Sequence, residues 1–418
     1  MGLHVLKFGG TSVGSLKRLE NVADIVSARA KEHQVIVVLS AMSGETDSLI
    51  EQAKHFTQVP NPRELDVLLT VGEQKSVALF SICMLARGIK AKSFLGSQIQ
   101  IKTSNDHTKA RITEIADHGV RASLKRGEIV VVPGFQGVTE TGELTTLGRG
   151  GSDTTAVAIA AALKADVCDI YTDVEGVYTT DPNIEPKAKK LSSITYDEML
   201  ELASLGAKVL QTRSVEFAKK YKVPLHVRST FKDVQGTWVL EESKLMEALV
   251  VSGITYTKNE AKVVVEGMPD RVGIAADLFM KVGEAGVGVD VIVQNVSKDQ
   301  TTDISFTVPR SDLRKAIEVI DKHKDVLKHK QIRGDDRISK ISVIGNGMRS
   351  HSGVAARMFQ ALAKENINIQ MISTSEIKIS CVIDEKYSEL AVRVLHDCFG
   401  LDKIGNQEIE IKEVNDFR

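Results

Sequence analysis

The chain has 418 residues, more than one ordinary hydrophobic core accommodates, so two or three domains are expected. Its formal net charge is −1, and 26% of its residues are charged, which argues against nucleic acid or an anionic membrane as the main partner. We find no secretory-signal pattern and no apolar run near the ~20 residues of a membrane span. The 4 cysteines show neither close pairing nor metal-ligand spacing, so we expect a cytoplasmic protein with reduced thiols and no protein-bound metal.

Strand-like and helix-like runs alternate through residues 1–240, which is typical of an α/β domain with a mostly parallel sheet. Short apolar runs predict buried strands, and apolar residues recurring at three and four predict helices. In chain order we expect a strand at Leu3–Phe8, a helix at Ser15–Lys31, a strand at Gln34–Leu39, a helix at Leu65–Arg87, and strands at Glu128–Val132, Val167–Tyr171 and Pro224–Arg228.

Polar and glycine residues follow the expected strands at the ends where parallel sheets bind ligands. These ends carry Gly9-Gly10, Ser40-Ala41, Gly134-Phe135 and Thr172-Asp173. Lys7 lies at the end of the first strand, where its charge can neutralise a transferring phosphoryl group. We therefore expect one rim of the sheet to form the ligand site.

The most informative motif is a glycine-rich turn, Gly148–Gly151, that runs into Ser152-Asp153 and an alanine-rich helix. Glycine lets the backbone approach a ligand, and the free N–H groups at a helix N-terminus form an anion site. Arg149 lies inside the turn, where its fork can hold a carboxylate or a phosphate bidentately. Together these features indicate a site that handles phosphates.

Other phosphate-handling motifs are missing from the sequence. There is no Walker A pattern, no GxGxxG after the first strand, and neither HRD nor DFG. A P-loop enzyme, a Rossmann dehydrogenase and a protein kinase are therefore disfavoured.

Glu73 follows Gly72 within a helical pattern. A mid-helix glycine costs ~1 kcal/mol relative to alanine, so it usually has a packing or ligand reason. A glutamate at the rim suits a substrate ammonium, although a solvated helical glutamate is the commoner case. Lys208, taken alone, is compatible with an ordinary surface lysine.

The C-terminal part contains an internal repeat. The copies begin at Lys262–Gly267 and Lys340–Gly345, and each reads strand, loop, helix, strand, strand, helix, with third strands at Thr302–Val308 and Glu376–Ile383. This order predicts two ferredoxin-like α+β modules. A further strand, Leu249–Tyr256, precedes the first copy and is compatible with pairing to either. The repeat suits either a dimerisation platform or an amino-acid sensor.

These motifs together resemble those of the aspartate kinases, in family order and over essentially the whole chain. The matching segments are KFGGTSVG at Lys7, SAMSGETD at Ser40, GE at Glu73, TTLGRGGSDTTA at Thr145, YTDVEGVYTTDP at Tyr171, GAKVLQTRSVEFA at Gly206, VIVQNVS at Val291, TTDISFTV at Thr301, GMRSHSGVA at Gly347 and ISTSEI at Ile372. The resemblance implies an α/β amino-acid-kinase fold at 1–240, a linker plus a first ACT module at 241–336, and a second ACT module at 337–418.

The reaction that the resemblance implies is phosphoryl transfer from ATP, with Mg²⁺, to the side chain of L-aspartate, the first step toward lysine, threonine and methionine. Lys7 and Lys208 would contact the transferring phosphate, and Asp153 would orient the catalytic lysine. The implied substrate-binding residues are Ser12, Ser40, Ala41, Thr46, Glu73 for the ammonium, Arg149 for the α-carboxylate, and Ser152. The implied nucleotide-binding residues are Gly9, Gly10, Thr172, Asp173, Tyr178 and Asp181.

The resemblance also implies feedback inhibition by lysine, threonine or both, through the ACT modules. The expected effector-binding residues are Asp270, Gly273, Ile274, Gln294, Asn295, Met348, Ser375 and Glu376. The expected assembly is a homo-oligomer or an α₂β₂ complex with a separately translated regulatory subunit, for which Met246 is a candidate start. One residue departs from the pattern: Asn183 stands where many relatives have an arginine that reaches the ATP phosphates.

Two alternatives stay open. The first is a related phosphotransferase that acts on glutamate or on a nucleoside monophosphate such as UMP. The second is an amino-acid-sensing protein with an inactive kinase domain. Glu73 together with Arg149 favours a zwitterionic amino acid, and the retained Lys7, Asp153 and Lys208 favour an active enzyme.

Overall fold

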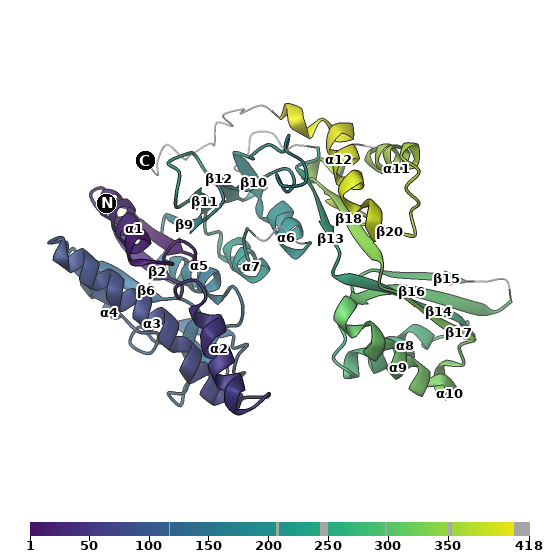
Figure 1. Ribbon diagram of the computed structural model, residues 1–418, viewed down its shortest axis with the longest axis horizontal. Coiled ribbons are helices and arrows are strands. Elements are labelled where there is room, and N and C mark those ends of the chain that lie inside the picture. Colours follow the sequence, from purple (N-terminus) through teal and green to yellow (C-terminus); the bar gives the residue numbers. More distant parts are fainter. Residues whose placement is uncertain are drawn as a thin grey trace. The chain divides into compact units, whose positions relative to one another are not determined.

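The computed structural model describes residues 1–116, 118–205, 209–242, 250–296, 299–349, 351 and 353–404 (Figure 1). The chain divides into two compact units. Among the described residues, unit 1 comprises 1–178 and 190–242, and unit 2 comprises 179–189 and 250–404. Met246 lies outside the described residues, and the sequence-based boundaries at 240 and 336 stay predictions.

An eight-stranded sheet in the order β10-β12-β11-β9-β1-β2-β6-β3 forms the centre of unit 1. Neighbouring strands run parallel except β11 and β12, which confirms the mostly parallel sheet. Its strands are β1 (Leu3–Phe8), β2 (Gln34–Leu39), β3 (Ala91–Ser93), β6 (Ile129–Pro133), β9 (Val167–Thr172), β10 (Ser193–Thr195), β11 (Leu225–Ser229) and β12 (Thr237–Leu240). The apolar runs of β2 and β6 are buried, as expected for strands covered on both faces.

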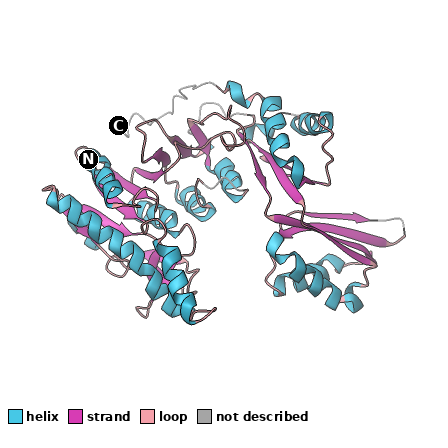
Figure 2. Cartoon of the chain, viewed as in Figure 1, coloured by secondary structure: helices cyan, strands magenta, loops and turns pink. Residues whose placement is uncertain are grey.

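Helices cover both faces of this sheet (Figure 2). Leu6 and Phe8 of β1 pack against α1 (Leu16–Arg29) and α3 (Pro62–Ala86). Because strand side chains alternate, Lys7 points to the opposite face, where it meets α5 (Gly151–Leu163). The other helices of unit 1 are α2 (Glu45–Phe56), α4 (His118–Lys125), α6 (Tyr196–Ser204) and α7 (Thr212–Tyr221).

Caps fix where α1 and α3 begin. Ser15 accepts a hydrogen bond from the backbone N–H of Arg18, so it is the N-cap of α1 rather than its first residue. Asn61 caps α3, and Pro62 occupies the first helical position, where its missing N–H costs nothing. α3 is the one helix among the described residues that is long and apolar enough to cross a membrane, but half of its most apolar window is buried inside the protein, as in a core helix.

A second, four-stranded sheet of unit 1 has the order β5-β4-β7-β8. Its strands are β4 (Ile101–Thr103), β5 (Ile112–Ile115), β7 (Gln136–Val138) and β8 (Leu144–Thr146). The sequence did not predict this sheet, because its strands are only three or four residues long. It matters for the site because β8 leads directly into the glycine-rich turn.

Unit 2 contains the two predicted modules, each a four-stranded antiparallel sheet with helices. The first has the strand order β15-β16-β14-β17, from β14 (Glu260–Pro269), β15 (Ile292–Val296), β16 (Thr301–Pro309) and β17 (Gln331–Asp335), with helices α8 (Ile274–Glu284), α9 (Leu313–Lys322) and α10 (Lys324–Leu327). The second has the order β13-β18-β20-β19, from β13 (Gly253–Thr257), β18 (Ile338–Ile344), β19 (Met371–Thr374) and β20 (Lys378–Asp384), with α11 (Val354–Lys364) and α12 (Ser388–Phe399).

The sequence did not determine which module β13 pairs with. This strand precedes the first module in the chain, yet it pairs with β18 of the second module. It fills the fourth strand position of that sheet, which β17 fills in the first module. The first module is therefore an insertion into the second, since the second module's strands stand on either side of it in the sequence.

The segment Thr179–Lys189 also belongs to unit 2. Ile254 of β13 donates its backbone N–H to the carbonyl oxygen of Thr179 at 2.7 Å, and Ile184 packs against the core of the second module. The Thr179 hydroxyl and His396 Nε2, on α12, form a buried hydrogen bond at 3.0 Å. The chain thus leaves unit 1 after Tyr178 and returns to it at Lys190.

Candidate active site

Five parallel strands end at one rim of the large sheet, and the residue after a strand donates a backbone hydrogen bond to the end of a neighbouring strand. Gly9 donates to Tyr171 at 3.3 Å, Ser40 to Phe8 at 3.1 Å, Gly134 to Leu39 at 2.9 Å, and Thr230 to Thr172 at 2.9 Å. The rim therefore runs without a break from β11 through β9, β1 and β2 to β6. This is the edge at which ligands of parallel sheets bind.

Lys7 and Asp153 form an ion pair at this rim. Lys7 Nζ lies 2.6 Å from Asp153 Oδ1, and both side chains are about nine-tenths buried. Asp153 lies in the first turn of α5, where a carboxylate also interacts favourably with the helix dipole. The pair fixes the lysine ammonium between the end of β1 and the N-terminus of α5.

Gly72 explains how the loop after β2 reaches α3. A Cβ at position 72 would lie 2.9 Å from the Cβ of Ala41, closer than real side chains approach. Because glycine has no Cβ, Ala41 packs directly on the helix, and its backbone N–H donates to Glu73 Oε1 at 3.1 Å. The mid-helix glycine thus has the packing reason that its sequence position predicted.

Glu73 carries a buried carboxylate with one oxygen still available. Its Oε1 is bonded to Ala41, whereas Oε2 is buried without a hydrogen-bond partner, and the residue is only 3% exposed. Burial raises the pKa of Glu73 to about 7. A carboxylate held this way has a strong requirement for a cationic partner.

The glycine-rich turn presents Arg149 to solvent beside α5. Gly150 has a φ of 73° and a Cβ there would overlap Gln211, so only glycine fits this N-cap position. Arg149 is exposed, and no hydrogen bond or ion pair of its guanidinium is recorded among the described residues. Ser152 is buried at the start of α5. The turn therefore leaves one cation free for a ligand.

Thr230 is a rim residue that the sequence analysis missed. Its hydroxyl forms a 2.7 Å hydrogen bond with that of Ser12, which is fully buried, and its backbone carbonyl accepts from Asn21. The sequence did contain a signal for it: the polar pair Ser229-Thr230 directly follows the strand predicted at 224–228, just as Thr172-Asp173 directly follows the strand predicted at 167–171. Ser40 and Thr46, on the loop after β2 and the first turn of α2, are partly exposed.

The expected nucleotide residues fall in both units. Thr172 donates its hydroxyl hydrogen bond to the exposed Asp173 at 3.1 Å, and Tyr178 pairs with Lys190, all in unit 1. Asp181 lies in unit 2. Its Oδ1 accepts hydrogen bonds from both the backbone and the side-chain N–H of Asn183, each at 2.9 Å. Asn183 is therefore a turn residue that closes the loop on Asp181.

The expected effector-binding residues are divided between the two modules of unit 2. Asp270, Gly273 and Ile274 lie between β14 and the start of α8, and Gln294 and Asn295 lie on the edge strand β15. In the second module, Met348 lies in a 3₁₀ turn after β18, and Ser375 and Glu376 connect β19 to β20.

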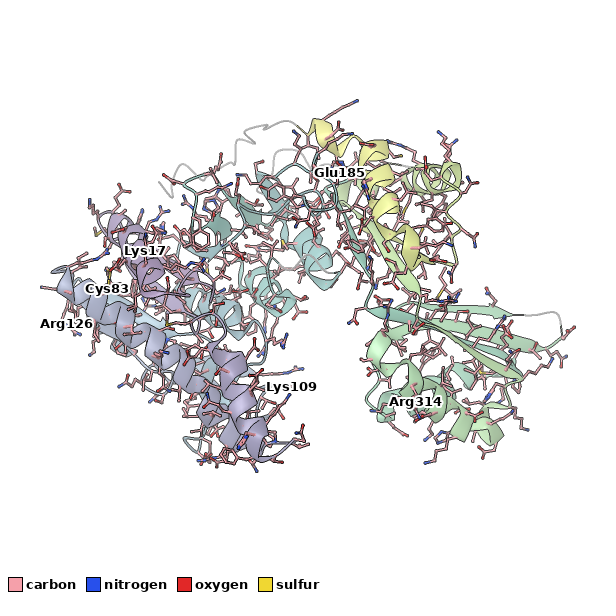
Figure 3. The ribbon with its side chains drawn as sticks, viewed as in Figure 1. Lys17, Cys83, Lys109, Arg126, Glu185 and Arg314 are labelled. Atoms are coloured by element: carbon pink, nitrogen blue, oxygen red, sulfur yellow. The ribbon has the colours of Figure 1, made fainter. Side chains whose placement is uncertain are left out.

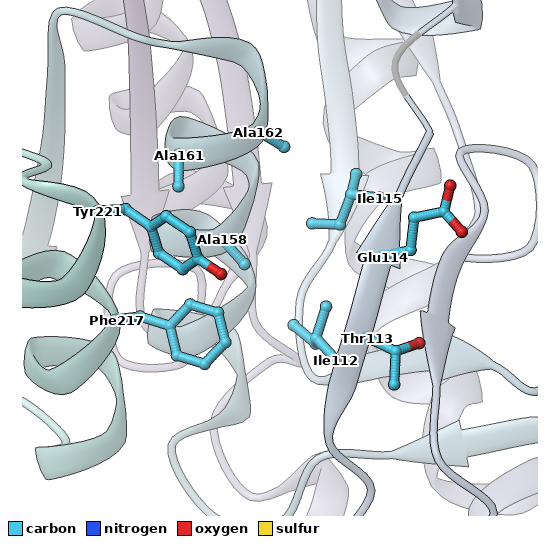
Figure 4. A pocket seen from close by; sticks show the side chains of 9 residues that line it. All are labelled: Ile112, Thr113, Glu114, Ile115, Ala158, Ala161, Ala162, Phe217 and Tyr221. Carbon is cyan, nitrogen blue, oxygen red and sulfur yellow. The ribbon is translucent and has the colours of Figure 1, made fainter.

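Three further observations delimit the site. Lys208 lies outside the described residues. In the part of the chain that the structure describes, no three His, Cys, Asp or Glu side chains gather in a group that could hold a metal ion. An open pocket of about 150 Å³, between β5 and the helices α5 and α7, is lined mainly by apolar residues such as Ile112, Ala161 and Tyr221, together with Thr113 and Glu114 (Figure 4). It adjoins the C-terminal half of α5, whereas the rim uses its N-terminus.

Comparison with known proteins gives a consistent result over the whole chain. The amino acid kinase family model matches residues 2–229, and an ACT domain model matches residues 262–323 and 341–399. The chain is 54% identical to the aspartate kinase of Pseudomonas putida over 409 residues, which cover 97% of this chain and 100% of the relative. The chain belongs to the aspartate kinase family.

Solved structures of aspartate kinases share its fold. The structure of Escherichia coli aspartokinase III in complex with aspartate and ADP, in the R-state, is 25% identical, with a TM-score of 0.80 over 95% of this chain and 99% of that one. The T-state structure of the same enzyme with lysine and aspartate has a TM-score of 0.75, at 25% identity, over 94% and 99% of the two chains. The predicted aspartate-kinase fold, an amino-acid-kinase domain followed by two ACT modules, is confirmed.

The variant Gly72→Ala changes both the helix propensity of α3 and the packing of Ala41, and the thermal midpoint and kcat/KM report these two effects separately. Alanine favours the helix by about 1 kcal/mol, which offsets part of the cost of displacing Ala41, so the thermal midpoint should change little. The new methyl group must push Ala41 away and weaken its hydrogen bond to Glu73, so kcat/KM for the amino-acid substrate should fall about tenfold. Gly283→Ala, at an open position inside helix α8 with ordinary helical backbone, is the matched control for methyl addition. A Gly72→Ala enzyme with unchanged kcat/KM would contradict this packing argument.

Proposed function

We propose that the chain transfers the terminal phosphoryl group of ATP to the side-chain carboxylate of L-aspartate, giving 4-phospho-L-aspartate, with the rim residues described above as its active site. The observation that carries the proposal is the buried Glu73 carboxylate, whose unpartnered oxygen needs a cation, on the same rim as the Lys7–Asp153 pair. A ligand that carries an ammonium and also reacts with a phosphoryl group satisfies both.

The nucleophile of this reaction needs no general base. A free carboxylate has a pKa near ~4, so it is ionised at neutral pH. The difficulty is to bring two anions together, which calls for cations and alignment rather than proton transfer. Lys7 supplies the cation, and its contact with Asp153 holds the ammonium in one place. Alignment alone can contribute roughly 7–11 kcal/mol to lowering such a barrier.

The aspartate site is formed by residues on both sides of this lysine. Glu73 binds the substrate ammonium through Oε2, and Arg149 binds its α-carboxylate. Ser12 and Ser152 lie near the reacting groups, and the loop and helix residues Ser40, Ala41 and Thr46 line the pocket.

The nucleotide lies along Gly9 and Gly10 and is held by Thr172, Asp173 and Tyr178, with Lys208 as a second phosphate contact. Mg²⁺ bound to ATP would supply charge neutralisation at the phosphates. An ion that arrives with the nucleotide takes most of its ligands from phosphate oxygens and waters. The bond from Asn183 to Asp181 supports a shaping role for that residue rather than a phosphate contact.

Feedback regulation by lysine, threonine or both acts through the ACT modules. The route we propose is covalent: Tyr178 of the nucleotide loop is followed directly by a segment that packs within the second module. An effector that shifts the packing of this module changes the path of the nucleotide loop. The coupling of binding is reciprocal, so an effector that weakens ATP binding is itself bound more weakly in the presence of ATP. We place the enzyme in the cytoplasm, as an oligomer of one chain or with a regulatory subunit.

An ADP-release assay with aspartate, glutamate and UMP as acceptors tests the proposed function. Aspartate alone should support turnover, and lysine and threonine, singly or paired, should reduce it. Turnover with glutamate or UMP instead of aspartate would assign the chain another substrate, and no turnover with any acceptor would favour a sensor without activity. If no amino acid inhibited the enzyme, the ACT modules would have a structural role only.

Lys7→Ala and Arg149→Ala should affect different kinetic constants. Removing the lysine cation should lower kcat about 10²–10³-fold with little change in the aspartate KM, because its charge acts mainly on the transferring phosphate. Arg149→Ala should chiefly raise the aspartate KM. Arg126, an exposed arginine paired with Glu128 and labelled in Figure 3, provides a charge-removal control as Arg126→Ala. Near-normal turnover by the lysine variant, or an unaltered KM in the Arg149 variant, would refute the assigned role.

The aspartate KM should depend on pH through Glu73. Only the ionised carboxylate binds an ammonium, and its pKa in the free enzyme is about 7 because of burial. KM should therefore rise about tenfold as pH falls from 8 to 6. Glu73→Gln is neutral at every pH, so its KM should be high and constant over this range. A wild-type KM that does not change between pH 8 and 6 would exclude this role of the carboxylate.

A further inference from the structure

Asp66 is a fully buried carboxylate to which no step of the proposed reaction assigns a role. It lies on α3, seven residues before Glu73, so the two carboxylates lie about two helical turns apart on one side of the helix. Its oxygens accept hydrogen bonds from the Thr146 hydroxyl at 2.6 Å, from the Thr108 backbone N–H at 3.1 and 3.0 Å, and from His107 Nδ1 at 2.8 Å. The donors come from two segments far from α3 in sequence.

These partners belong to the structures that carry the glycine-rich turn. Thr146 is the last residue of β8, two residues before Gly148. Thr108 has a φ of 66°, a conformation that β-branched residues rarely adopt, and its carbonyl oxygen lies 3.3 Å from the position of a Cβ on Gly148. The loop that contains Thr108, and Lys109 labelled in Figure 3, therefore packs directly against the turn.

A second set of bonds extends this support. Ala110 donates its backbone N–H to the Thr146 carbonyl at 2.9 Å, and Arg213 donates to the carbonyl oxygens of Leu147 and Ala110 at 3.1 and 3.0 Å. Asp66 fixes the side chain of Thr146, and these bonds fix the backbone around it. An uncompensated buried charge is costly, so the carboxylate keeps its donors in place.

Aspartate accepts these converging hydrogen bonds better than asparagine, which has a similar size. A carboxylate only accepts, so both oxygens can bind the donors that converge on it. An asparagine would place its NH₂ group against the Thr108 N–H, which lies near both carboxylate oxygens. The geometry therefore depends on two equivalent acceptor oxygens.

We propose that Asp66 is a positioning residue of the active site, which holds Thr146 and Thr108 and thereby the turn that presents Arg149 to the substrate α-carboxylate. The inference rests on the proposed function for the identity of that carboxylate. α3 then supports both ends of the amino-acid substrate, Glu73 directly and Arg149 through Asp66.

The test compares Thr146→Val, which keeps the shape and removes the hydroxyl, with Thr146→Ser, which keeps the hydroxyl. The valine variant should raise the aspartate KM about tenfold and leave the ATP KM within about twofold, while the serine variant stays close to wild type. Hydrogen exchange in the peptide 147–151 should become faster in the valine variant alone.

Thr195→Val is the matched control, because Thr195 also donates a buried hydroxyl hydrogen bond to a carboxylate, Glu198, at 2.7 Å, on the edge strand β10. It should lower the thermal midpoint without changing the aspartate KM. If Thr146→Val does not fold, His107→Ala removes a partly exposed partner of the same carboxylate and should raise the aspartate KM by a smaller factor.

Two results would overturn the proposal: unchanged exchange in the peptide 147–151, or an aspartate KM in the valine variant that matches wild type while its thermal midpoint falls as in Thr195→Val. Failure of the proposed function looks different. Wild type would then release no ADP with aspartate, while the exchange difference between valine and serine would still report whether Asp66 positions the turn.

Discussion

The electrostatic repulsion between a nucleotide phosphate and a substrate carboxylate is the constraint on which the arrangement of unit 1 depends. The buried pair of Lys7 and Asp153 reduces this repulsion, because it fixes a cation at the end of the central strand. Both side chains are largely withdrawn from water, so the lysine acts in a medium where its charge is poorly screened. Five parallel strands bring the other polar residues to the same rim.

Glu73 is the second buried charge of the site, and it is destabilising until a ligand arrives. Its pKa, about 7, lies above the ordinary value of 4.5, so folding stability falls as pH rises from about 4.5, where the unfolded chain releases the proton, to about 7, where the folded chain releases it. A substrate ammonium at the unpartnered oxygen offsets this cost. Burial therefore makes Glu73 selective for cationic ligands. An exposed glutamate would bind the same ammonium only weakly. Gly72 permits the arrangement, because the loop of Ala41 could not approach a larger residue.

Much of this was predictable from the sequence, for physical reasons that apply to particular residues. Buried strands such as Gln34–Leu39 are apolar after their first residue, and the bounds of this strand agree with the prediction. The rim followed from the rule that parallel strands share their carboxyl ends. The short strands of the second sheet were not predictable, because three or four residues are too few to show a period. Asp66 gave no signal either, since its donors lie about 40 and 80 residues away in the chain.

The most direct test of this account is a crystal structure of the chain with aspartate and ADP. We predict that the substrate ammonium contacts Glu73 Oε2, that its α-carboxylate contacts Arg149, and that its side-chain carboxylate points toward Lys7. Aspartate bound in the reverse orientation, with its side-chain carboxylate on Arg149, or bound away from the rim, would contradict the account.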